Sequence, residues 1–244
     1  THANRPLRLL ELADMFKAVI ESRRSNSLKE NKDLVRLACG PLLEILPDET
    51  VSVVHHSLTE FLIGSSRTVE PPVFPVLASS PTHYNLALVC LGYLCSGWLH
   101  DERVTLRNLA QDRSRINLHF PFAAYAIDNW HVHATRSNWS GLPEDPLSQQ
   151  LEKLMSDENT RNNWLRLYSE DPNPRALVPP KRPEWGLRMI SEVTSLVFYG
   201  RDENQGSSLS DLHVAALCGL EAIIPTLIKP LGIDGEDTRG RTPL

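Results

Sequence analysis

Two proline-rich segments divide this chain more sharply than any other feature of its sequence. Residues 65–82 hold four prolines and residues 171–183 hold five. Because proline lacks a backbone N–H and clashes with the preceding helical turn, both segments are expected to be irregular connectors. A polar stretch with a glycine, residues 202–208, follows the second connector. These breaks predict three domains, at residues 1–66, 67–201 and 202–244.

The first 66 residues alternate between helical and strand patterns. Apolar residues three and four positions apart predict an amphipathic helix over residues 7–21, and residues 22–30 are expected to be loop. A second helix is expected to begin at Asn31 or Asp33 and to end at Gly40. Residues 42–46 and 51–55 predict a short β-hairpin. Ser57, with Glu60 three residues later, predicts the capping box of a third helix. This order is typical of a winged-helix module.

The central part reads as helical throughout. Apolar periodicity predicts helices over residues 84–100, 104–110, 122–135 and 184–199, and two helical pieces over residues 147–168. In the helix over residues 122–135, Phe122, Ala126, Trp130 and His133 fall near one face, and Trp130 and Tyr125 are expected in the core. We therefore expect a mainly α fold: a winged-helix module with a short β-hairpin, followed by a helical linker domain.

A motif near the C-terminus adds a repeat signature to this fold. Residues 210–215 read SDLHVA, and residues 241–244 read RTPL, with 32 residues between Ser210 and Thr242. The first motif resembles the T-P-L-H-x-A start of an ankyrin repeat, whose period is about 33 residues, although Asp211 stands where proline is usual. The resemblance implies one repeat and the start of a second in residues 202–244, with a first helix that ends at Gly219 and a second over residues 221–228. It also implies a structural role for His213, and protein partners. Because such repeats need neighbours, the chain is expected to be part of a longer protein.

Four further stretches carry a second resemblance. They read VVHHSLTEFL at residues 53–62, PLRLLEL at 6–12, LACGP at 37–41 and PFAAYAIDNWHVHA at 121–134. They resemble the winged-helix domain, and the helix that follows it, in fungal NACHT–ankyrin proteins, which are NLR-like STAND receptors. The resemblance implies a cytoplasmic signalling segment whose upstream NACHT module binds ADP or ATP. It also implies that His55 contacts the diphosphate of ADP; the competing interpretation is that His55 merely ends a strand beside the next helix.

Other chemistries find little support in the sequence. The balance of 25 Lys and Arg against 30 Asp and Glu gives a net charge of −5, which argues against nucleic acid as a partner. The chain holds no GxxxxGK[ST], GxSxG or HExxH sequence, so no catalysis is expected in this segment. The four cysteines form no CxxC pair. His131 and His133 lie two residues apart on a predicted helix, so their side chains point to different sides and are not expected to share a metal. The uncharged stretch over residues 84–99 is too short to span a membrane.

Two alternative functions remain open at this stage. The first is a winged-helix nucleic-acid-binding module that reads its target with residues 31–39, where Lys32 and Arg36 supply the basic charge. The second is an enzyme of an unrecognised class in residues 84–208, supported by a supply of His, Asp and Trp side chains that any core could contain.

Overall fold

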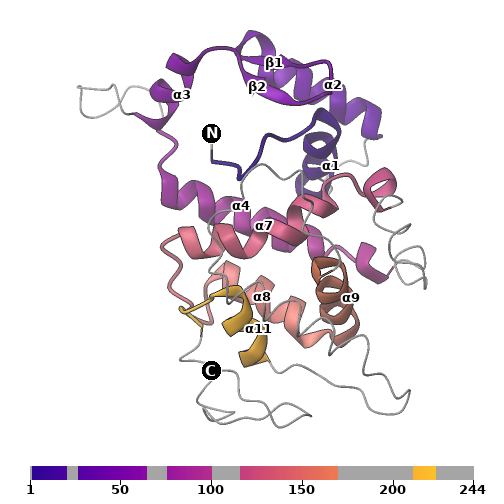
Figure 1. The fold of residues 1–244 in the computed structure, drawn as a ribbon, viewed down its shortest axis with the longest axis vertical. Coiled ribbons are helices and arrows are strands. Elements are labelled where there is room, and N and C mark those ends of the chain that lie inside the picture. Colours follow the sequence, from indigo (N-terminus) through magenta and orange to yellow (C-terminus); the bar gives the residue numbers. More distant parts are fainter. Residues whose placement is uncertain (1, 21–26, 65–75, 101–115, 170–210, 224–244) are drawn as a thin grey trace. The chain divides into compact units, whose positions relative to one another are not determined.

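The computed structural model describes residues 2–20, 27–64, 76–100, 116–169 and 211–223. This part of the chain is mainly helical, with one two-stranded antiparallel sheet, as expected (Figure 1). The chain divides into two compact units, residues 1–138 and residues 139–244. The predicted boundaries at 66/67 and 201/202, and the helices predicted over 104–110 and 184–199, lie outside the described residues. Within the described ranges, no helix is both long enough and apolar enough to cross a bilayer.

The N-terminal unit begins with two helices that pack on each other, α1 (Leu9–Ile20) and α2 (Leu28–Cys39). Helix α2 starts at a capping box: the Glu30 backbone N–H donates to Ser27 Oγ at 3.2 Å, and the Ser27 N–H donates to the Glu30 carboxylate at 2.7 Å. The predicted caps, Asn31 and Asp33, are therefore wrong, and part of the predicted loop is helix. The reciprocal pair satisfies two orphan N–H groups one turn earlier. The helix ends at Gly40, whose φ is +46°, as predicted.

The hairpin follows directly and is confirmed. Strands β1 (Leu43–Ile45) and β2 (Val51–Val53) pair antiparallel, with Glu44 opposite Ser52. Residues 7–9 extend this pairing beyond the prediction: the Val51 N–H donates to the Leu7 carbonyl and the Leu9 N–H to the Glu49 carbonyl, both at 2.9 Å. A third helix, α3 (His56–Ile63), completes the predicted order of helix, helix, hairpin and helix.

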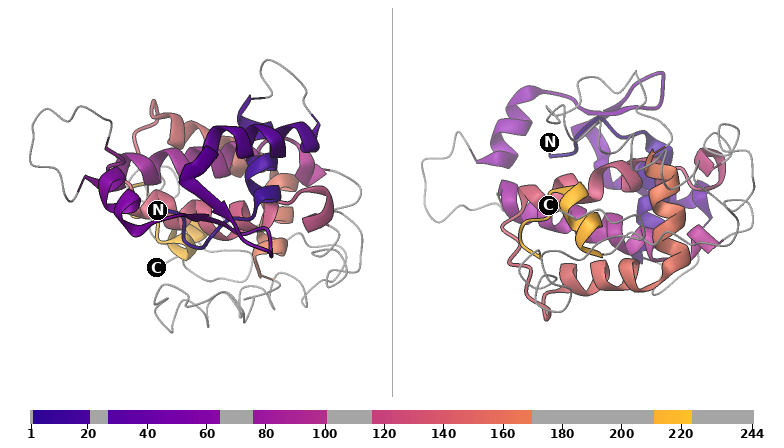
Figure 2. Two further views of the ribbon diagram at one scale, coloured as in Figure 1. Left: turned by 90° about the horizontal axis from the view of Figure 1, so that it is seen from above. Right: turned by 60° about the horizontal axis from the view of Figure 1, so that its bottom comes forward.

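Two long helices, α4 (Ser79–Leu94) and α7 (Ala123–Arg136), form the centre of the N-terminal unit. They lie side by side (Figures 1 and 2), and α1 packs against α4. Helix α4 begins five residues before the predicted start at Tyr84, because Pro81 occupies the first turn, where its missing N–H has no helical partner. A 3₁₀ turn, η2 (Trp98–His100), follows. The largest fully buried side chains of this unit are Leu9, Leu91, Leu94, Leu99, Phe122, Tyr125 and Trp130.

Asp14 ties α1 to both of these helices. Its Oδ2 accepts a hydrogen bond from the Tyr93 hydroxyl of α4 at 2.5 Å and from the Phe122 backbone N–H at the start of α7 at 3.1 Å. The carboxylate is 7% exposed. A negative charge at the N-terminus of a helix also interacts favourably with the helix dipole. One buried carboxylate therefore holds three helices together, and burial beside it raises the pKa of the Tyr93 hydroxyl.

The C-terminal unit contains α8 (Pro146–Ser156), α9 (Glu158–Ser169) and α11 (Asp211–Cys218). The first two confirm the prediction of two helical pieces. Asp145 caps α8 by accepting the Leu147 N–H at 2.8 Å. Gly141 has a φ of +69°, and a Cβ added there would lie 2.3 Å from the carbonyl oxygen of Ala222. The chain therefore passes so close to the turn at residues 221–223 that only glycine fits.

Helix α11 ends in a Schellman motif. The Leu220 N–H donates to the Ala215 carbonyl at 2.9 Å, the Gly219 N–H donates to the Ala216 carbonyl at 3.2 Å, and Gly219 has a φ of +66°. The prediction that Gly219 ends this helix is confirmed. Residues 221–223 of the predicted second repeat helix form a turn, and its remainder, residues 224–228, lies outside the described residues.

Candidate functional site

His55 lies between β2 and α3 and caps the helix. Its backbone is extended, with φ −143° and ψ 138°, and its Nδ1 accepts the Ser57 N–H at 3.2 Å and lies 2.8 Å from Ser57 Oγ. The predicted cap at Ser57 is therefore wrong. The imidazole performs the role that a short hydroxyl side chain would normally have at this position.

This cap decides where the His55 proton resides. Because Nδ1 accepts a backbone N–H, it carries no proton, and the neutral ring is protonated on Nε2. The side chain is exposed, so Nε2–H is a donor on the protein surface. Its neighbour His56 differs: its Nδ1 lies 3.5 Å from Glu60 on the same helix. Of the two histidines, His55 is the one whose outer nitrogen is fixed as a donor.

The helix that His55 begins is only partly covered by the described residues, among which Leu58, Thr59 and Leu62 are half-buried. No residue of α3 is buried, although its sequence, HSLTEFLI, is half apolar. Large apolar side chains are also exposed on α2, on the hairpin and beside it in the N-terminal unit. Together with those of α3 we call them the α2–α3 apolar surface: Leu34, Leu37, Leu42, Ile45, Leu46, Val54, Phe61 and Ile63. Exposed apolar side chains that gather in one patch typically mark an interaction site.

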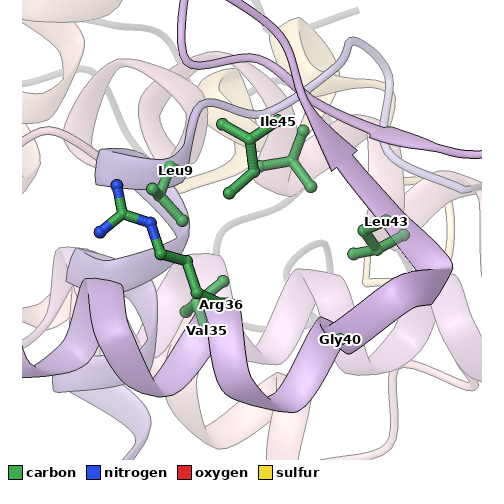
Figure 3. A pocket seen from close by; sticks show the side chains of 7 residues that line it. Leu9, Val35, Arg36, Gly40, Leu43 and Ile45 are labelled. Atoms are coloured by element: carbon green, nitrogen blue, oxygen red, sulfur yellow. The ribbon is translucent and has the colours of Figure 1, made fainter.

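A small cavity lies between α1, α2 and the hairpin. Figure 3 shows Leu9 and Val35 on one side of it and Leu43 and Ile45 on the other, with Arg36 at its edge. Its volume is about 30 Å³, which admits one or two water molecules. The cavity is too small for a substrate and is a packing gap beneath the hairpin.

Two of the three basic residues of α2 are held by carboxylates. Lys32 Nζ lies 2.7 Å from Glu49 Oε1, and Arg36 lies 3.1 Å from Asp33. The two cations that a nucleic-acid reading helix would need are therefore already engaged in ion pairs within the protein. This pairing weakens the nucleic-acid alternative, because affinity for a phosphate backbone depends on cations available to displace counterions.

A buried polar cluster joins α4 to α7. His83 Nδ1 lies 2.8 Å from His133 Nδ1, and His133 Nε2 lies 2.8 Å from the Tyr125 hydroxyl. The core positions predicted for Tyr125 and Trp130 are confirmed, since both are fully buried, and His133 is fully buried as well. Burial lowers the pKa of His133 to about 4 and also lowers that of His83. The sequence analysis missed His83, because 50 residues separate it from its partner and no local pattern links them.

The other His and Cys residues considered as candidates do not form a metal site within the described residues. Among the described residues, no group of three or more His, Cys, Asp or Glu side chains is arranged to bind a metal ion. His131, like His133, is buried. Cys90 is a buried thiol, and its burial raises its pKa. The side chain of His213 lies outside the described residues.

Comparison with known proteins assigns no relative. No protein-family model matches the chain, and neither a curated protein nor a solved structure matches it significantly. The function is therefore inferred from the residues themselves and from the resemblance of their motifs.

Proposed function

We propose that this chain is a non-catalytic regulatory segment of a STAND signalling receptor, in which it couples an ankyrin sensor to an upstream NACHT nucleotide switch. In the resting state, His55 donates a hydrogen bond from Nε2 to the diphosphate of ADP held by that NACHT module. The observation that carries the proposal is the His55 cap, which uses Nδ1 and leaves a protonated Nε2 on the surface. A single neutral donor of this kind can bias a two-state switch, since the bond is broken when the domains move apart.

The α2–α3 apolar surface supports a module docked beside His55. A helix that buries none of its residues has little tertiary packing to stabilise it, and eight residues are too few for a stable isolated helix. A NACHT module resting on α3 would bury Phe61 and Ile63 and would bring its bound nucleotide to the N-terminus of the helix.

Two further observations agree with the proposed architecture. Residues 7–9 form a bridge to the hairpin at Thr50, beside β2, and the order of helix, helix, hairpin and helix is the one expected of a winged-helix module. At the other end, α11 carries the SDLHVA motif and ends in a glycine Schellman motif, as the first helix of an ankyrin repeat does. The repeats would bind protein partners in the cytoplasm, and the bound nucleotide would be ADP or ATP.

The test uses the full-length receptor and the substitution His55→Asn. Asparagine is a good N-cap, so α3 keeps its start, but its side chain is too short to reproduce the Nε2 donor. A hydrogen bond to a charged group contributes about 1.5–3 kcal/mol, so ADP affinity is expected to fall about tenfold or more. The matched control, His56→Ala, is expected to leave ADP affinity unchanged. Unaltered ADP affinity in His55→Asn would show that the histidine is only a helix cap.

A further inference from the structure

The N-terminal segment, residues 2–5, is fastened to α7 by polar side chains; we call it the N-terminal strap. The Asn4 backbone N–H donates to the Tyr125 hydroxyl at 3.2 Å, and Asn4 Nδ2 donates to Asn129 Oδ1 at 2.7 Å. Arg136 in turn donates to Asn4 Oδ1 at 2.7 Å. These three hydrogen bonds of Asn4 all involve residues of α7. The strap therefore has a defined seat on α7.

The strap also reaches α4 and α1. The ring of His2 stands edge-on to that of His83, with 5.5 Å between the ring centroids. Arg5 lies 5.2 Å above the Tyr125 ring and makes a two-pronged ion pair with Glu11, at 2.6 and 2.9 Å. The strap thus contacts both ends of the buried His83–His133–Tyr125 chain.

The hydrogen bonds of this chain have a direction. Since burial raises the pKa of the Tyr125 hydroxyl, the phenol keeps its proton, and its oxygen already accepts the Asn4 N–H. The hydroxyl therefore donates to His133 Nε2. Neutral His133 then carries its proton on Nδ1 and donates to His83 Nδ1, which must be an acceptor. The Asn4 N–H, the Tyr125 hydroxyl and the His133 Nδ1–H each have an acceptor in the chain only in this arrangement, and it requires both histidines to be neutral.

We propose that the His83–His133 pair is a pH-responsive latch, which holds the N-terminal strap on α4 and α7 when neutral and releases it when a proton is added. A proton on His83 Nδ1 removes the acceptor of His133. His133 must then turn its own proton toward the Tyr125 oxygen, and the tyrosine proton loses its acceptor. The His133 Nε2–H then competes with the Asn4 backbone N–H for the Tyr125 oxygen.

The surrounding charges favour release once a proton arrives. The titratable or charged groups facing the pair and Tyr125 come from the strap, α1, α4 and α7, and are His2, Arg5, Glu11, Cys90, Asp128 and Arg136. Arg136 and His2 act on the histidines and oppose a positive charge there. Glu11 is already neutralised by its ion pair with Arg5. No carboxylate among these described groups is hydrogen-bonded to either ring, so a histidinium formed in place has nothing to stabilise it.

The size of the effect follows from linkage. With the pKa of buried His133 at about 4 and that of an exposed histidine at about 6.5, acidification from pH 7 to pH 4 can weaken the seated state by at most a few hundredfold. The strap leads straight into residues 7–9, which pair with β2. Its release therefore removes one support of the hairpin. Protonation of the buried histidines in this way changes the packing beside the α2–α3 apolar surface.

The experiment is a pH titration of the full 244-residue chain from pH 8 to about pH 3, below the pKa of about 4 of His133, followed by amide and histidine NMR signals. We expect the Asn4 backbone and side-chain amide signals to move to unstructured positions with the same midpoint as the His83 and His133 ring signals. That midpoint should lie below 6.5.

Two variants separate the latch from general acid sensitivity. In His83→Asn, Oδ1 still accepts the His133 proton but cannot itself be protonated, so the midpoint of strap release should fall by about one pH unit or more. His56→Asn should leave the midpoint unchanged. If the Asn4 signals stay in place while both buried histidines titrate, or if His83→Asn releases the strap at the wild-type pH, the latch does not exist.

Discussion

The clearest quantitative test of the fold concerns the buried carboxylate of Asp14. Substitution by alanine leaves two buried donors, the Tyr93 hydroxyl and the Phe122 N–H, without an acceptor. Each unsatisfied buried donor costs about 1–3 kcal/mol, so Asp14→Ala should lower the free energy of unfolding by about 2–6 kcal/mol. Tyr93→Phe removes only one donor to a charged acceptor and should cost about 1.5–3 kcal/mol.

The double variant makes this prediction specific. If the Tyr93–Asp14 bond acts as described, the two losses are not additive, because alanine has already removed the acceptor of the hydroxyl. We expect a coupling free energy of about 1.5–3 kcal/mol, measured by urea unfolding followed by circular dichroism at pH 7. Asp33→Ala is the matched control: its exposed ion pair with Arg36 should contribute no more than about 0.5 kcal/mol. If the losses of stability in Asp14→Ala and Tyr93→Phe add to within about 0.5 kcal/mol in the double variant, Asp14 does not hold α4 through Tyr93.

Two further predictions address the buried histidine and the tight turn of the C-terminal unit. The folded-state pKa of His133 lies near 4, below its unfolded value of about 6.5, so its contribution to stability is complete above pH 6.5 and is lost as the pH falls toward 4. Urea unfolding should therefore show the free energy of unfolding falling by about 3 kcal/mol across this range. The variant His133→Gln should show a smaller dependence of stability on pH. A pH-independent wild type would contradict this. Gly141→Ala should destabilise the C-terminal unit by more than Gly219→Ala, because both positions have a positive φ but only Gly141 abuts a backbone oxygen, that of Ala222. Equal thermal shifts in the two variants would argue against the close approach.

Local signals in the sequence predict most of the helices and the hairpin, and they fail where two signals compete. The glycines Gly40 and Gly219 end helices as expected, since each adopts a positive φ that other residues avoid. The start of α2 was misjudged, because two plausible caps follow the capping box at Ser27. Pro81 was taken for a breaker, although a proline in the first turn of a helix is tolerated.

The polar contacts of the core could not have been predicted from one sequence. Asp14 and Tyr93 are 79 residues apart, and His83 and His133 are 50 residues apart. Hydrophobic periodicity indicates which face of a helix is buried, but it does not indicate which polar side chains on two buried faces will meet. His55 is an intermediate case: its position was singled out by resemblance, whereas its role as a helix cap, and hence the proton on Nε2, comes from the structure.

The most direct test of the proposed receptor segment is its binding to the NACHT module that the proposal requires in the full-length protein. Isothermal titration should show the 244-residue chain binding the ADP-loaded module about tenfold more tightly than the ATP-loaded one, with that preference lost in His55→Asn and kept in His56→Ala. Binding that is indifferent to the nucleotide, or a full-length protein without a G-x-x-x-x-G-K-[ST] sequence, would contradict the account.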